Sequence, residues 1–505
     1  MKRYVLTTSI AFIWAGIAWA SNPDRVSLTI YGTGQPGSVP TTMYRPTPGV
    51  TTEPYGTVPG FAVVKQERSV ELNAGHDHVR FTDVTALIDP TTVSFDSLTD
   101  PAGTRVLDQD YRFDLVDTRQ LLDRYVDQEI TVHQGLGDDH STFTGVLLSA
   151  RDGLLLKGSN GDVQNFRSYS RIEFPELPNG LVTKPTLVWN LTTRTSGEHR
   201  VRVTYQTEGI TWWADYILTY QEGEDANACS VDVSAWVSIV NRSGASFADA
   251  GLKLIAGDVN RVSQPAVRTE LARTLALAED VSSGFTEKPF FEYHLYTLDR
   301  NTSLSNNSTK QIELFPPVRN VACNKELVYY GTPGFQGHFP RPAIDRNLGI
   351  QTNKEVDVYL HLDNSTQNRL GVPLPGGRVR VNKLDPSDDT LEFIGEDTID
   401  HTPKDEEVIV KLGNAFDVIG ERKQLDFRTD NQRRWIEEDI EIEIRNRKLK
   451  PVTVTIKENL YRWINWQIDE ASHDYEKQDA RTIHFPVRLP GDSQTTVRYT
   501  VRYTW

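Results

Sequence analysis

The sequence predicts a mainly β protein made of tandem antiparallel β-sandwich modules, with a small Sm-like or SH3-like barrel in its N-terminal region. The main observation is alternation: residues 231–239 carry apolar side chains at every second position, with Asp232, Ser234 and Ser238 between them. Successive side chains on a strand point to opposite faces, so this pattern indicates half-buried strands. The same alternation recurs at 356–362, 440–444 and 483–489. Helical periodicity is limited to two stretches, 118–125 and 265–280.

Residues 1–20 are typical of a cleavable signal peptide. Lys2 and Arg3 precede an uncharged run that ends in a small-x-small pattern, which predicts cleavage between Ala20 and Ser21. The alternative is a membrane-anchoring helix. The run is near the lower length limit for crossing a bilayer, and no basic stop-transfer cluster follows it. We therefore expect a periplasmic or secreted protein, with no transmembrane helix in the mature chain.

The N-terminal half divides into two predicted regions. Residues 21–117 form a β region interrupted by a loop at 32–60, whose Gly, Pro and Thr content leaves too few apolar residues to pack a core. Residues 118–175 combine one short helix with about five short strands, which is the pattern of the small barrel.

For the C-terminal half, the sequence predicts sandwich modules in series. They are a central region at 181–432 and an immunoglobulin-like module at 433–505. Three strands end in Asn241, Asn364 or Asn446, each followed by a polar turn. The last strand alternates up to Trp505, as terminal strands of outer-membrane barrels often do. Its preceding strands are uneven in length, which favours a sandwich and leaves an outer-membrane β-barrel as an alternative.

Cys229 and Cys323 are the only two cysteines of the chain. In an oxidising compartment, this pair predicts one disulfide, and the alternative is two buried thiols. Neither cysteine has a second Cys or His at metal-ligand spacing, so no structural zinc site is expected.

The formal net charge of −15 opposes binding of nucleic acid and adsorption on anionic lipid. The remaining partner classes are a protein or a glycan of the cell envelope. No sequence motif for a nucleotide, a catalytic serine elbow or a zinc-binding helix occurs, so we expect no cofactor and identify no catalytic residue.

Several stretches together resemble the bacterial domain-of-unknown-function family 4139, over roughly residues 181–505. The stretches that carry the resemblance are 209–220, 241–262, 288–298, 308–315, 368–381, 395–408 and 445–460. Some relatives carry the label "mucoidy inhibitor" and have an N-terminal coiled coil. This chain has no heptad repeat there, so the label is not transferred. The resemblance implies no catalytic residues.

Three polar stretches contain residue types that bind metals, and each is explained more simply as a turn. His76 and His78 share a face if they lie on a strand, but no third ligand is identifiable. Residues 138–140 lie in a loop flanked by glycine, and residues 385–389 lack the Gly and Glu of a calcium loop. No metal is therefore expected.

The stretch 209–220 contains the candidate ligand-binding residues Trp212, Trp213, Asp215 and Tyr216. Adjacent tryptophans on a strand point to opposite faces, so one could stack on a sugar ring or a partner side chain. The alternative is that both pack internally. The sequence predicts a non-catalytic binding or envelope-scaffold protein. The alternatives are a carbohydrate-active or other hydrolase with an acidic site, and the outer-membrane barrel.

Overall fold

A computed structural model confirms the mainly β fold, with 64% of residues in strands and 2% in helices. It describes residues 18–19, 23–32, 39–44, 58–135, 141–176, 178, 181–257, 259, 285–332, 339–350, 352–430 and 432–505. The predicted cleavage point Ala20–Ser21, most of the signal peptide, the predicted helix 265–280 and the loop 138–140 lie outside the described residues. In the described parts, no helix is long and apolar enough to span a bilayer.

The N-terminal part is built from two sheets that share one core. The four-stranded sheet has the order β1 (Ala18–Trp19), β4 (Gly75–Thr82), β12 (Thr186–Thr193) and β6 (Arg105–Arg112). The eight-stranded sheet contains β17 (Phe285–Phe290), β18 (Tyr293–Leu298), β16 (Phe247–Ala256), β2 (Arg25–Tyr31), β3 (Phe61–Leu72), β13 (Gly197–Thr207) and β5 (Ile88–Ser97), with β19 (Thr302–Leu304) beside β16. Trp189 is fully buried between the sheets and packs against Phe81 and Phe95.

These sheets do not follow the predicted boundary between 21–117 and 181–432. Strand β13 pairs with β3 along eleven residues, and β16 pairs in parallel with β2. Pairing of strands so distant in sequence leaves no trace in local periodicity, because each strand shows only its own alternation.

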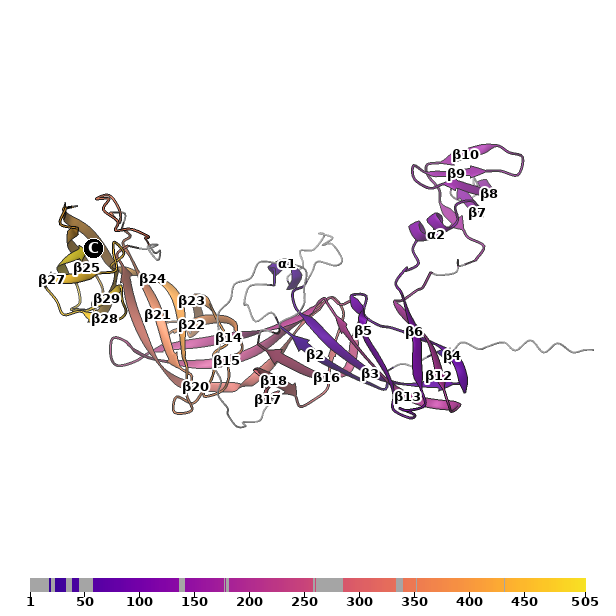
Figure 1. Cartoon of the computed structure of the whole chain (residues 1–505), viewed down its shortest axis with the longest axis horizontal. Helices are drawn as coiled ribbons and strands as arrows, with labels where there is room; N and C mark the ends of the chain where they lie inside the picture. Colours follow the sequence, from indigo (N-terminus) through magenta and orange to yellow (C-terminus); the bar gives the residue numbers. More distant parts are fainter. Residues whose placement is uncertain are drawn as a thin grey trace, which may run out of the picture.

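The predicted small module is present as α2 (Thr118–Arg124) followed by five strands. They are β7 (Glu129–Gln134), β8 (Ser141–Ser149), β9 (Leu154–Lys157), β10 (Val163–Phe166) and β11 (Arg171–Glu173), in the sheet order β10-β9-β8-β7-β11. Asp117 caps the helix by accepting a hydrogen bond from the Gln120 amide. The sheet is open between the short edge strands β10 and β11 and is not closed into the predicted barrel. It has its own core and stands apart from the other sheets (Figure 1).

One sheet of thirteen strands forms the rest of the molecule. Its main path is β23 (Thr390–Ile399), β22 (Gly377–Asp385), β14 (Ile210–Glu222), β15 (Ala228–Asn241), β20 (Ser308–Tyr330), β21 (Glu355–Asp363), β24 (Glu407–Asp430), β25 (Trp435–Asn446), β30 (Ser493–Thr504) and β27 (Trp466–Ala471). Strands β26 (Val452–Asn459), β29 (Thr482–Leu489) and β28 (Glu476–Lys477) complete it.

The short helix α1 (Thr41–Tyr44) lies in the segment 32–60, which the sequence predicts to be a loop.

This sheet packs on two hydrophobic cores: a central core, which it shares with the two N-terminal sheets, and a C-terminal core. The C-terminal core is lined by the apolar faces of β25, β26, β29 and β30, on which Ile442, Ile456 and Phe485 are fully buried. The last strand also turns Val497 and Tyr503 into this core, so its alternation serves sandwich packing. Strands β20 and β24 are 23 and 24 residues long and run from the central to the C-terminal part (Figure 1).

The three asparagines that end strands have buried side chains and similar bonding. The Asn241 side chain donates to the Ala245 and Ser305 carbonyls and accepts from the Ser243 amide. The Asn446 side chain donates to the Lys450 and Pro490 carbonyls and accepts from the Lys448 amide.

Asn364 makes the third such clamp. Its side chain donates to the Val372 and Pro403 carbonyls and accepts from the Gly371 amide. Each asparagine therefore joins its own turn to a loop that is distant in sequence. This is a wider role than the local turn bonding that the sequence predicts.

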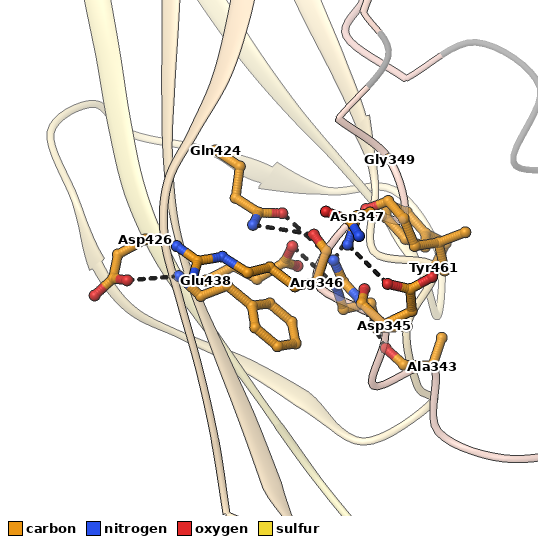
Figure 2. A network of polar contacts seen from close by, with 12 residues as sticks. Ala343, Asp345, Arg346, Asn347, Gly349, Gln424, Asp426, Glu438 and Tyr461 are labelled. Atoms are coloured by element: carbon orange, nitrogen blue, oxygen red, sulfur yellow. Dashed lines mark hydrogen bonds and ion pairs between the residues drawn. The ribbon is translucent and has the colours of Figure 1, made fainter.

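Two buried arginines hold segment 339–350 against the C-terminal module. Arg462 donates to the Ala343 and Asp345 carbonyls, both at 2.7 Å, and to the Leu348 carbonyl at 3.0 Å. Figure 2 shows this segment beside the strands that carry Gln424 and Glu438. The charge of Arg462 is balanced by Glu438 at 2.8 Å. Backbone carbonyls thus accept hydrogen bonds from both terminal nitrogens of a guanidinium that has no access to water, and the Glu438 carboxylate balances its charge.

Candidate functional site

Strand β14 separates the four predicted ligand-binding residues onto two faces. Trp212 and Tyr216 point into the central core, where each is 3% exposed, and the Tyr216 hydroxyl donates to the Pro375 carbonyl at 2.8 Å. Trp212 lies edge-on to the buried Tyr296 ring. The structure therefore places Trp212 and Tyr216 in the core, where a ligand on the surface does not reach them. Trp213 and Asp215 occupy the outer face.

Asp215 lies at the centre of a polar group on this outer face. One carboxylate oxygen accepts hydrogen bonds from Arg378 of β22, at 3.0 Å from Nη2 and 3.2 Å from Nε. The other accepts from the Ser238 hydroxyl of β15, which in turn accepts from Gln311 of β20 at 3.0 Å. Because β14 lies between β15 and β22, the sheet order itself brings these side chains together.

Three aromatic side chains surround the Asp215–Arg378 pair. Trp236 is directly opposite Asp215 in the register of β14 and β15 and is 36% exposed. Trp213 is opposite Ser238, two positions along, and is half-buried. Tyr44 of α1 packs its ring 5.4 Å from the Trp213 ring, and its hydroxyl accepts from Arg378 at 3.4 Å. We call Tyr44, Trp213, Trp236, Asp215 and Arg378 the aromatic face.

Sequence reasoning missed three members of the aromatic face. Trp236 could have been recognised, because it lies on the polar side of the alternation in 231–239 and an aromatic residue there is expected to meet solvent. Arg378 and Tyr44 carry no such signal. Arg378 reaches Asp215 through a parallel pairing of β14 with β22, more than 150 residues away, and Tyr44 lies in the segment predicted to be a loop.

The chemistry of the aromatic face favours recognition. Both oxygens of Asp215 already accept hydrogen bonds, and its charge is neutralised by a guanidinium, so it is not a free base or nucleophile. Indole and phenol rings offer flat apolar surfaces, and Arg378, whose side chain is 19% exposed beside the buried Asp215, can fix the orientation of a polar ligand.

A second polar site surrounds His361 in a cleft of about 850 Å³ next to Cys323. The imidazole Nδ1 is 2.9 Å from Glu407 and Nε2 is 3.2 Å from Glu326, while Lys457 lies 3.5 Å from Glu326. The hydrogen bond with Glu326, followed by the contacts with Glu407, raises the pKa of His361 despite partial burial. The hydrogen bond from His361 holds the pKa of Glu326 at about 2. Both ring nitrogens are occupied, so this site is an ionic clamp across three strands.

Cys229 and Cys323 form a disulfide between directly opposite residues of β15 and β20. The bond closes the 94-residue separation between these strands at the rim of the His361 cleft. It therefore reinforces the pairing on which the cleft is built.

Of the stretches considered as metal sites, residues 385–389 form the predicted turn, whereas His76 and His78 lie on strand β4 and not in a turn. His76 and His78 are exposed on β4, and Asp77 between them is buried and accepts from the Asn73 amide at 2.8 Å. Asp385 accepts from the Ser387 amide at 2.8 Å within the turn between β22 and β23. Across the parts of the chain that the structure describes, no group of three or more His, Cys, Asp or Glu side chains is placed to bind a metal ion.

Comparison with known proteins identifies no similar protein. No family model matches the chain, and no curated protein or solved structure matches it at a significant level.

Proposed function

We propose that this chain is a non-catalytic binding protein of the cell envelope, exported to the periplasm or beyond, and that its aromatic face binds a glycan. The observation that carries the proposal is the pair Trp213 and Trp236 beside the satisfied Asp215–Arg378 ion pair. Diagonal neighbours on adjacent strands are about 7–8 Å apart, so both indoles can contact one oligosaccharide. The already bonded carboxylate favours holding a sugar over cleaving it.

The test is binding of purified cell-wall polysaccharide to the full-length chain, measured by co-sedimentation and calorimetry. Trp236→Ala is expected to weaken binding at least fivefold, since removal of an aromatic side chain that anchors a partner costs about 1 kcal/mol or more. Phe416→Ala is the matched control, because Phe416 is an exposed aromatic residue of β24, at 93%, outside the aromatic face. Retention of a protein but of no glycan by the wild-type chain would overturn the glycan assignment.

A second candidate is hydrolysis of a cell-wall polymer in the His361 cleft. The observation that favours it is the gathering of Glu326, Glu407 and His361 in one polar cleft. Catalysis there would require a ring nitrogen of His361 to leave its carboxylate partner. Release of new reducing ends that disappears in His361→Asn, and not in Trp236→Ala, would establish this candidate in place of the first.

Membership of residues 181–505 in family 4139 is part of the proposal. The segment 209–220, which contributes to the resemblance, forms most of β14 and supplies Trp213 and Asp215. Members of that family should then have asparagine at the positions of the three strand-ending clamps. A member structure in which these positions are not asparagine would count against the assignment.

A further inference from the structure

The turn that joins β25 to β26 presents a leucine to solvent. Leu449 is 94% exposed. The backbones of its neighbours Lys448 and Lys450 are fixed by hydrogen bonds. The Asn446 side chain accepts from the Lys448 amide and donates to the Lys450 carbonyl, each at 3.0 Å. The Asp492 amide donates to the Lys448 carbonyl at 2.8 Å. The exposed position of Leu449 is therefore fixed by a bonded turn.

Gly491 shows how closely the neighbouring turn is packed against this one. A Cβ atom at Gly491 would lie 2.1 Å from the Leu449 carbonyl oxygen, so only glycine fits without movement of the backbone. The Leu449 backbone is thus enclosed while its side chain projects outward.

Four lysines from three parts of the fold gather around this turn. Lys448 and Lys450 flank Leu449, Lys383 comes from the end of β22, and Lys325 comes from β20. The carboxylate of Glu222, at the end of β14, is shared by two of them, 2.8 Å from Lys383 Nζ and 3.4 Å from Lys450 Nζ.

Neither Lys325 nor Lys448 forms an ion pair with any residue that the structure describes, whereas Lys383 and Lys450 share Glu222. Lys325 is in addition half-buried. Burial lowers its pKa first, and the charges of Lys448, Lys383 and Lys450 lower it further, against the opposing effect of Glu222 alone. Like charges this close repel each other, so an added anion would be attracted to the group.

The geometry points to a docking surface for a membrane rich in anionic phospholipid, formed by Leu449 together with Lys325, Lys383, Lys448 and Lys450. Ammonium groups bind lipid phosphates as point charges, and an apolar side chain at the centre of such a group enters the interfacial region. This surface lies at the far end of β14 from Trp213, so it extends the proposed function without depending on it.

The net charge of −15, from which the sequence predicts repulsion from anionic lipid, acts only weakly on this local group at contact. Charges separated by more than about 8 Å are largely screened at physiological ionic strength. The distant carboxylates therefore contribute little once the lysine group meets the membrane, although they slow the approach at low salt.

The test is co-sedimentation of the full-length chain with vesicles of phosphatidylcholine alone or of phosphatidylcholine containing phosphatidylglycerol. We expect binding to the anionic vesicles only, and its loss in high salt. Lys448→Gln with Lys450→Gln should weaken binding about 25-fold, at roughly fivefold for each lysine. Leu449→Asp should also abolish binding, because a carboxylate replaces the inserted side chain.

Two controls separate this inference from folding defects and from the glycan proposal. Lys184→Gln with Lys423→Gln removes two lysines that are 61% and 50% exposed outside the docking surface, and it should leave vesicle binding unchanged. Trp236→Ala should also bind vesicles normally. Equal binding to neutral and anionic vesicles, unchanged binding in the Lys448 and Lys450 double variant, or binding of inorganic phosphate without binding of vesicles would overturn the inference.

Discussion

Arg462 and Glu438 form an ion pair that is enclosed in protein, with side-chain exposures of 0% and 2% and a distance of 2.8 Å between Nε and Oε1. A nearby pair repeats the arrangement: Arg422 is 2.9 Å from Glu458, which also accepts from the Tyr499 hydroxyl. Arg422 also donates to the Gly349 carbonyl at 3.4 Å. Both arginines therefore connect the C-terminal core to the same incoming segment.

Removing one partner of the first pair should destabilise the C-terminal module strongly. Arg462→Ala leaves the Glu438 carboxylate buried without its closest counter-charge and removes a donor from three carbonyls of segment 339–350, which predicts a loss of roughly 3–5 kcal/mol. Chemical denaturation followed by tryptophan fluorescence measures this loss. The double variant Arg462→Met with Glu438→Leu should recover much of it, and a double variant as unstable as Arg462→Ala would contradict this explanation.

The His361 clamp should give the central module a stability maximum between two pH limits. The pKa of Glu326 is lowered to about 2 in the folded chain, so its contribution is present above pH about 4.5 and is lost as the pH falls toward 2. The pKa of His361 is raised, so its contribution is complete below the unfolded value of about 6.5 and is lost as the pH rises through the folded value.

Melting temperatures of the wild type and of two variants, measured at steps of about one pH unit from pH 3 to pH 9, test this clamp. His361→Asn should remove the decline on the alkaline side. Glu326→Gln should reduce both declines, since Glu326 is a partner of His361 and a titrating group itself. An alkaline decline that is identical in the wild type and in His361→Asn would show that another group is responsible.

The disulfide should contribute substantially to stability. Replacing Cys229 and Cys323 by serine opens a loop of 94 residues, for which chain entropy predicts a loss of about 4–5 kcal/mol. The denaturation midpoint of the oxidised wild type should exceed that of the double serine variant. The reduced wild type should match that variant, which serves as the control for changes in the cysteine environment.

The asparagine clamps should be intolerant of an isosteric carboxylate. In Asn446→Asp, an oxygen that cannot donate would face the Lys450 and Pro490 carbonyls, which predicts a loss of about 2–4 kcal/mol. Asn368→Asp is a partly matched control, because Asn368 also donates to two carbonyls but at an exposed position. Amide hydrogen exchange at residues 446–450 should rise in Asn446→Asp. Equal effects of the two variants would argue against a special role for burial.

The local pattern of the sequence is sufficient to predict the class of the fold and several of its strands. The alternation at 231–239, 440–444 and 483–489 corresponds to β15, β25 and β29, and α2 with five strands follows as expected. Asn241 was recognised as the end of a strand, but its bonds to a loop near residue 305 were not. Those bonds depend on tertiary contacts, which local periodicity does not contain.

The candidate sites were less predictable than the strands for the same reason. Trp213 and Asp215 were chosen from one strand, whereas the aromatic face needs β15, β22 and α1 as well. The His361 clamp draws on β20, β21 and β24, and its three residues stand in unremarkable sequence surroundings. A site assembled across a sheet is visible only when the strand order is known.

Strands β20 and β24 connect the central and C-terminal parts of the molecule without a break in the sheet. Each is hydrogen-bonded to central strands along one stretch and to C-terminal strands along another. A hinge between these two parts would have to break both ladders at once. Tension applied along these strands would load many hydrogen bonds in shear together, so the central and C-terminal parts should move as one unit.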